Sequence, residues 1–139
     1  MLFVGAFERQ IDDKGRLALP ASFRGHLGDH CYLVKGLDKC IDVLPVDTFE
    51  RVALDLRESV VHGDTSRNRQ RALAWSAKLV NVDRQGRVLL EDKLRAYAEI
   101  GPDQQVMVAG NIDRLEIWAP DRFARVESSG TDDMAGDDE

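Results

Sequence analysis

Two short stretches of the chain place an aspartate four residues before an arginine, with a glycine between them. They are DDKGR at residues 12–16 and DRQGR at residues 83–87. An aspartate at this distance can meet the arginine across a tight turn and hold its guanidinium group in one orientation. A guanidinium group held in this way presents two parallel donors that match guanine O6 and N7, or phosphate oxygens. The pattern indicates a nucleic-acid site, with the bracing of a hairpin as the purely structural alternative.

The two stretches belong to an internal repeat. Residues 11–24 align with residues 82–95 at an offset of 71, and residues 36–49 align with residues 110–123 at an offset of 74. Because the Asp–Arg pattern recurs in register, we favour the nucleic-acid interpretation over simple bracing. Gly15 and Gly86 are predicted to supply the positive φ of the two turns.

The elements that would position these turns follow from the hydrophobic pattern. Each half is predicted to contain a strand, the glycine turn, a second strand, a short helix at 20–27 or 91–100, and two further strands. Asp47 is predicted to cap a helix, with Glu50 in the capping-box position, and an equivalent helix begins at Asp121. Ser66 is predicted to cap a connecting helix.

The expected organisation is therefore two modules with a tail. The first module covers residues 1–57, a linker and the start of the connecting helix cover 58–71, and the second module covers 72–126. Residues 127–139 contain six acidic and no basic residues, and we expect them to form a disordered tail. Residues 1–126 contain 19 acidic and 19 basic residues, so the net charge of −6 does not exclude a nucleic-acid partner.

Other chemistry receives little support from the sequence. His26, His30 and Cys31 could begin a zinc site, but no second pair of ligands follows, so we expect no metal and no cofactor. The chain has no nucleotide-binding loop and no hydrolase motif, and Asp12 and Asp13 have no nucleophile or histidine to act with, so we expect no enzyme and no small-molecule substrate. The apolar start is too short for a signal peptide or a membrane span.

Three further groups of residues have two interpretations each. The arginines of the connecting helix either form a solvated face, which we favour, or contact phosphates; they are Arg67, Arg69 and Arg71. The aromatic residues are expected in the core rather than as stacking platforms for bases; they are Phe49, Trp75, Trp118 and Phe123. Cys31 and Cys40 are expected to be buried, reduced thiols in a cytosolic protein.

The doubled D-x-x-G-R unit, the sequence LEIW at 115–118 and the short N-terminal strand resemble the MraZ family of transcriptional regulators, which have two AbrB-like (SpoVT-AbrB) modules. The resemblance covers residues 1 to about 126. It implies a mainly β (α+β) fold with two tandem modules of the swapped-hairpin type, which form one pseudo-symmetric unit. It also implies ring-shaped homo-oligomers, a cytoplasmic, nucleoid-associated location, and binding to double-stranded DNA at direct repeats in the promoter of the division and cell-wall gene cluster.

The same resemblance assigns DNA contact to the arginine of each motif, and Lys14 matches the common KGR form of the first one. The candidate DNA-binding residues are Asp12, Lys14, Gly15, Arg16, Asp83, Gly86 and Arg87. Gln85 stands where the first motif has Lys14, so the two turns are not expected to contribute equally. The alternative function is a self-assembling protein whose Asp–Arg turns lock subunits together without a role for DNA.

Overall fold

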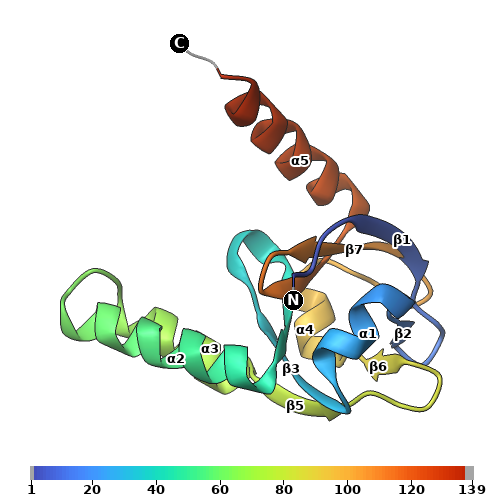
Figure 1. Cartoon of the computed structure of the whole chain (residues 1–139), viewed down its shortest axis with the longest axis horizontal. Helices are drawn as coiled ribbons and strands as arrows, with labels where there is room; N and C mark the ends of the chain where they lie inside the picture. Colours follow the sequence, from blue (N-terminus) through green and yellow to red (C-terminus); the bar gives the residue numbers. More distant parts are fainter. Residues whose placement is uncertain (1, 137–139) are drawn as a thin grey trace.

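The computed structural model of the chain describes residues 2–136 and is mainly β with short helices, as the sequence predicted (Figure 1). The strands are β1 (Ala6–Gln10), β2 (Arg16–Ala18), β3 (His30–Lys35), β4 (Ile41–Pro45), β5 (Lys78–Asn81), β6 (Arg87–Leu89), β7 (Gln105–Asn111) and β8 (Arg114–Trp118). The helices are α1 (Ala21–Leu27), α2 (Val46–Val61), α3 (Arg67–Ser76), α4 (Asp92–Tyr97) and α5 (Pro120–Ala135), with a 3₁₀ turn at Leu37–Lys39.

The two halves of the repeat exchange strands. One antiparallel sheet has the order β1-β7-β8-β4-β3-β5, so the first strand of each half pairs with a strand of the other half. The order is symmetric about its centre, because β1 is equivalent to β5 in the repeat, β7 to β3, and β8 to β4. The short strands β2 and β6, one from each half, form a separate antiparallel ribbon. The pseudo-symmetric swapped arrangement expected from the resemblance is therefore present.

A single hydrophobic core lies between these layers. Equivalent residues from both halves are almost completely buried in it, among them Leu17 with Val88, and Phe23 with Leu94. Modules of about 55 residues that bury a core alone are only marginally stable. Strand exchange lets the two halves share one core, which fixes the ribbon β2–β6 to the rest of the fold.

Helices α2 and α3 form an arm that extends from the sheet (Figure 1). The hydroxyl of Ser66 accepts a hydrogen bond from the Arg69 backbone N–H at 3.1 Å, so the predicted cap of α3 is confirmed. The predicted capping box of α2 is wrong. That helix begins at Val46 directly after Pro45, which places Asp47 inside the first turn, where its charge still favours the helix N-terminus.

Residues 127–135, which we expected to be disordered, are the second half of helix α5. The helix is 16 residues long and projects from the body (Figure 1). Its bounds are those of α2 moved by 74 residues, the offset of the repeat. Pro120 occupies the first turn, where its fixed φ suits a helix, and Asp121 complements the helix dipole. The remainder of the expected tail, residues 137–139, lies outside the described residues.

Trp75 also differs from expectation. Its side chain on α3 is 80% exposed, whereas Trp118 is buried as predicted. The apolar spacing around Trp75 is helical, but the arm packs through its other face, which leaves this ring in solvent. Cys31 and Cys40 are buried free thiols, as predicted. Within residues 2–136, no helix has the length and apolar character needed to cross a membrane.

Candidate nucleic-acid interface

The first Asp–Arg turn is held together by a single carboxylate. Oδ1 of Asp12 accepts hydrogen bonds from the backbone N–H groups of Lys14 (2.9 Å) and Arg16 (2.8 Å), and Oδ2 accepts one from Arg16 Nε at 2.8 Å. Gly15 has a φ of 83°, so the predicted positive φ is confirmed. Because the carboxylate engages Nε, the two terminal amino groups of the guanidinium remain available as a fork.

The second turn reproduces this arrangement. Oδ1 of Asp83 accepts from the backbone N–H groups of Gln85 and Arg87, both at 2.9 Å, and Oδ2 accepts from Arg87 Nε at 2.9 Å. Gly86 has a φ of 75°. The repeated sequence pattern is thus a repeated local structure, which depends on contacts within five residues.

The ribbon β2–β6 places the two arginines on one surface. Its register pairs Arg16 with Leu89 and Ala18 with Arg87, while Leu17 opposite Val88 faces the core. Side chains of paired residues lie on the same side of an antiparallel ribbon. Arg16 and Arg87 therefore both point outward. From strand spacing and rise, their Cα atoms lie about 8 Å apart.

Two further arginines, which sequence reasoning missed, support these turns from the opposite half. Arg24 lies over Gly86, where a Cβ atom would clash with its guanidinium group, and Arg95 lies over Gly15. Each is anchored through Nε to a backbone oxygen, that of Leu19 or Leu90. The glycines thus serve close packing as well as positive φ. The signal was available, because Arg24 and Arg95 occupy equivalent positions of the repeat.

Backbone hydrogen bonds also join the two halves at the turns. The N–H of Leu19 donates to Gly86 O at 2.9 Å, and the N–H of Leu90 donates to Gly15 O at 2.8 Å. Each turn is therefore clamped by the strand that follows the other turn. These hydrogen bonds fix the spacing of the two turns, which a pair of independent hairpins would not do.

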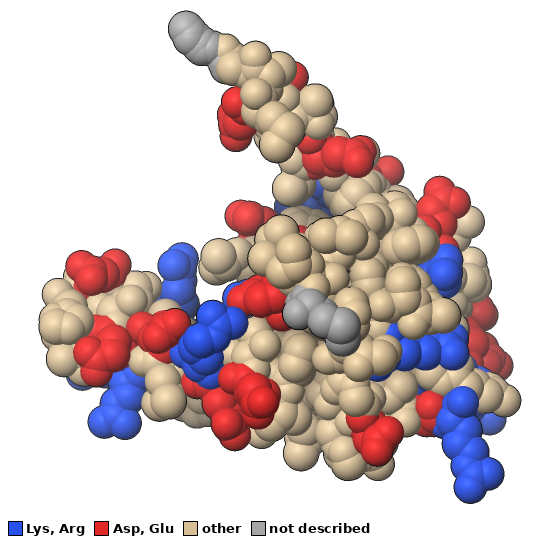
Figure 2. Space-filling model, in the orientation of Figure 1, with Lys and Arg blue, Asp and Glu red and all other residues tan. Residues whose placement is uncertain are grey.

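The charge around the turns is more balanced than the sequence comparison suggested. Gln85 replaces Lys14, but the exposed Arg84 stands where the first turn has Asp13. Each turn therefore has two basic residues, Lys14 with Arg16 and Arg84 with Arg87. Lys and Arg side chains gather at the lower right of Figure 2, at the end of the molecule where Figure 1 shows both turns.

The hydrogen bonds also set the ionisation of the two aspartates. The pKa of Asp12 is lowered chiefly by the backbone N–H of Arg16, and the pKa of Asp83 chiefly by that of Arg87. Both carboxylates are therefore ionised at neutral pH and remain acceptors for the guanidinium groups.

A separate polar cluster lies on the paired strands β4 and β8, where ligand atoms of Cys40, Asp42 and Glu116 come within 4.8 Å of one another. These groups already have partners, since Arg114 donates to Asp42 at 3.1 Å and the Trp118 indole donates to Glu116 at 3.1 Å. Burial raises the pKa of the Cys40 thiol well above its ordinary range. The cluster is a satisfied hydrogen-bond network, and its neutral thiol and adjacent guanidinium disfavour a cation.

Replacing Asp42 by asparagine will change the pH dependence of stability. Burial raises the pKa of Asp42 to about 6, against the opposing effect of Arg114, from an ordinary value of 3.8. Between these pH values the folded state binds more protons than the unfolded state. The contribution of Asp42 to the free energy of unfolding therefore falls as the pH rises, by about 3 kcal/mol in total. In urea unfolding, Asp42→Asn should become more stable relative to wild type as the pH is raised from 4 to 7. A constant difference across this range would contradict the assignment.

The other residues considered from the sequence are not brought into a site. His26 packs edge-on against Phe3, whereas His30 begins β3 and is exposed, so they form no zinc cluster with Cys31 among residues 2–136. Arg67, Arg69 and Arg71 lie on the exposed helix α3, as expected for a solvated face.

The chain is similar to known proteins along almost its whole length. Residues 2–71 and 73–137 match the family described as "MraZ protein, putative antitoxin-like". A relative from Roseiflexus sp. (strain RS-1), named transcriptional regulator MraZ, is 39% identical over 128 residues, which cover 92% of this chain and 88% of the relative. A protein of the same name from Bifidobacterium longum is 36% identical over 139 residues, covering 98% and 91%.

Proposed function

Because this chain belongs to the MraZ family, we propose that it is a transcriptional regulator that binds double-stranded DNA through the two Asp–Arg turns. We further propose that its sites are short direct repeats in the promoter of the division and cell-wall gene cluster. The observation that carries the DNA-binding part is the shared outward face of Arg16 and Arg87 on one ribbon.

The dimensions of the ribbon suit the DNA major groove. That groove admits a two-stranded β-ribbon, and a guanidinium fork matches O6 and N7 of guanine there. Arginines about 8 Å apart span two to three base pairs at about 3.4 Å each. Because Asp12 and Asp83 hold each guanidinium in place, little side-chain entropy is lost on binding.

One protein chain would not provide enough discrimination by itself. A bidentate arginine–guanine contact contributes about 1–3 kcal/mol, whereas specific regulators need about 4–10 kcal/mol over random DNA. We therefore propose that the protein is a homo-oligomer, with a ring as the expected form. Several copies would then bind successive repeats, and each contact after the first would be effectively intramolecular.

The rival function, in which the Asp–Arg turns lock subunits together, is less well supported. Asp12 and Asp83 are satisfied by groups of their own turns and need no partner from a second copy. Fluorescence anisotropy with DNA from upstream of its own gene cluster tests the proposal. We expect salt-sensitive binding that exceeds binding to random DNA at least tenfold. Equal affinity for both DNAs would contradict sequence-specific recognition, and no binding to either would favour the rival.

Asp12→Asn should weaken specific binding by at least about tenfold, because one hydrogen bond to a charged group is worth about 1.5–3 kcal/mol. The amide can still accept from the backbone, but its amino group cannot accept from Arg16 Nε. Asp13→Asn is a matched control, since it removes the same charge from an exposed neighbour. Anisotropy titrations of both variants separate orientation from charge: the hypothesis fails if Asp12→Asn and Asp13→Asn behave alike.

A further inference from the structure

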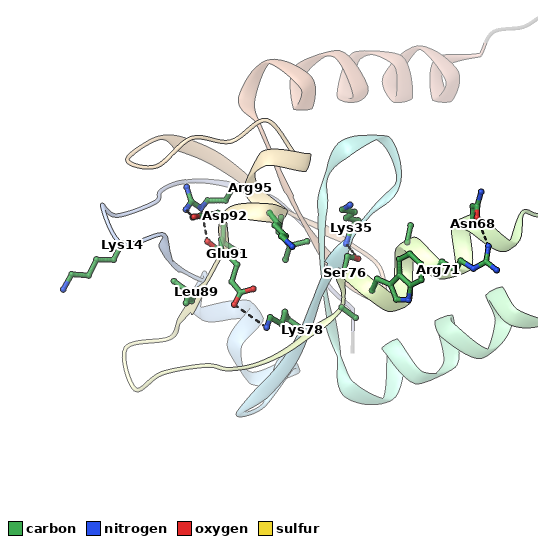
Figure 3. Close-up of a pocket in the computed structure, with 16 residues that line it drawn as sticks. Lys14, Lys35, Asn68, Arg71, Ser76, Lys78, Leu89, Glu91, Asp92 and Arg95 are labelled. Atoms are coloured by element: carbon green, nitrogen blue, oxygen red, sulfur yellow. Dashed lines mark hydrogen bonds and ion pairs between the residues drawn. The ribbon is translucent and has the colours of Figure 1, made fainter.

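Leu89 is a large apolar residue on the outward face of the ribbon β2–β6. Its side chain is 47% exposed, whereas the residues on either side of it, Val88 and Leu90, are buried. The register of the ribbon pairs Leu89 with Arg16. Leu89 and Lys14 of the first turn also line the groove drawn in Figure 3. An apolar side chain therefore lies on the face that the proposed function assigns to DNA.

The hydrogen-bond pattern of the ribbon places the Leu89 side chain directly beside that of Arg16. The backbone N–H of Leu90 donates to Gly15 O, which makes these two residues a hydrogen-bonded pair. Such pairs alternate along an antiparallel ribbon with pairs that lack these bonds, where opposite Cα atoms are only about 4.5 Å apart. Arg16 and Leu89 form a pair of this second kind, so their side chains lie close together on the outward face.

The equivalent position in the first half carries a much smaller side chain. Ala18 corresponds to Leu89 in the repeat, and it is paired with Arg87 as Leu89 is paired with Arg16. The side chain of Ala18 ends at its Cβ atom, whereas the branched side chain of Leu89 extends further from the ribbon. The two arginines of the outward face therefore have different neighbours, and this difference breaks the pseudo-symmetry of the ribbon.

The DNA major groove offers an apolar group that suits Leu89. The C5 methyl of thymine lies on the major-groove edge of the base, and apolar side chains contact it in protein–DNA complexes. Paired side chains of an antiparallel ribbon have Cβ atoms about 4.5–5.5 Å apart, and successive bases are stacked about 3.4 Å apart. A guanidinium fork and the apolar side chain beside it can therefore contact adjacent base pairs.

We propose that Leu89 contacts the C5 methyl of a thymine in the base pair next to the guanine that Arg16 binds. The inference rests on the proposed DNA-binding function and adds a residue that determines its sequence preference. Ala18 is too short to make the equivalent contact beside Arg87. The two ends of the ribbon therefore read different sequences, which gives the chain one preferred orientation on a site. Direct repeats keep a single orientation, whereas a reader with exact two-fold symmetry matches a palindrome.

The test removes the methyl group from the DNA and the leucine from the protein. Two duplexes carry the sequence upstream of the protein's own gene cluster, and they differ in having thymine or deoxyuridine at the thymine positions of the repeats. Deoxyuridine pairs as thymine does and lacks only the C5 methyl. Wild type, Leu89→Ala and Leu89→Met are titrated with both duplexes by fluorescence anisotropy. Leu79→Ala is the matched control, because Leu79 is an exposed leucine on β5, outside the ribbon.

Wild type should bind the deoxyuridine duplex at least about fourfold more weakly, which is the factor expected for one methyl-sized apolar group that is no longer buried. Leu89→Ala should bind both duplexes equally, because its side chain does not reach the methyl. Leu89→Met keeps the apolar reach and should keep the thymine preference, as should Leu79→Ala. Deoxyuridine placed only between the repeats should have no effect. Any change in DNA shape acts on all the proteins, so the difference between wild type and Leu89→Ala isolates the contact.

Three results would overturn the inference and leave the proposed function intact, provided that wild type prefers its site to random DNA. They are equal binding of the thymine and deoxyuridine duplexes by wild type, a full thymine preference in Leu89→Ala, and repeats that contain no thymine beside a guanine. If wild type does not distinguish its site from random DNA, the proposed function falls and this inference falls with it.

Discussion

Arg16→Ala will reduce affinity for the specific DNA site by at least about 100-fold while leaving the assembly intact. Each bidentate contact is worth about 1–3 kcal/mol, and loss of two or more such contacts in one oligomer multiplies their effects. The turn itself should persist, because Asp12 still accepts from two backbone N–H groups. Anisotropy titrations give the affinity, and ultracentrifugation of the same samples gives the mass.

Two further variants sharpen this prediction. Arg16→Lys keeps the charge but lacks the fork, so it should recover binding to random DNA better than binding to the specific site. Arg87→Ala should also weaken specific binding, because Arg84 and Arg87 make the second turn as basic as the first. Arg57→Ala on the exposed face of α2 is the control. If Arg16→Ala bound the specific DNA as wild type does, the first turn would have no role in recognition.

Insertion of about half a helical turn of DNA, ~5 bp, between two repeats will weaken binding sharply, whereas a full turn of ~10 bp will be less harmful. The two turns are held rigidly together, since the backbone N–H groups of Leu19 and Leu90 each donate a hydrogen bond to the glycine carbonyl of the opposite turn. Copies displayed on a regular oligomer therefore require repeats on one face of the DNA. Titration of the native, half-turn and full-turn DNAs measures both effects.

The salt dependence provides a second measurement on the same DNAs. Each neutralised phosphate contributes about 0.9 to the slope of log affinity against log salt. Several bound copies should give a steeper slope on native DNA than on the half-turn DNA, where fewer turns engage. Identical affinities and slopes for the two DNAs would contradict a regular array of bound copies and would indicate that the turns bind independently.

Much of the candidate site was predictable because it depends on local chemistry. The aspartate, the glycine and the arginine of each turn lie within five residues, and the observed hydrogen bonds are those that the spacing allows. The cap at Ser66 is local in the same sense. The predicted capping box at Asp47 was wrong, because β4 ends at Pro45 and the helix begins at the next residue, Val46.

Contacts between the halves were not predictable in this way. Arg24 and Arg95 are marked in the sequence only by their equivalence in the repeat, which does not say what they contact, and strand exchange is what brings them over Gly86 and Gly15. Trp75 was expected in the core from helical spacing, but spacing alone does not say which face of a helix finds a partner. The helical continuation of α5 was indicated by the offset of 74, although its acidic composition favoured disorder.

The sequence by itself determined that each of two equivalent turns holds an arginine. The hydrogen bonds between the aspartate and the arginine join residues only four apart, and they recur with the repeat. Only the tertiary structure decided that both arginines share one outward face, because that depends on the pairing of β2 with β6. It also decided that the outer part of α5 projects from the body, where Met134 is almost fully exposed. These positions depend on pairing between strands that lie far apart in the sequence. Burial of one common core favours that strand exchange over two separate modules.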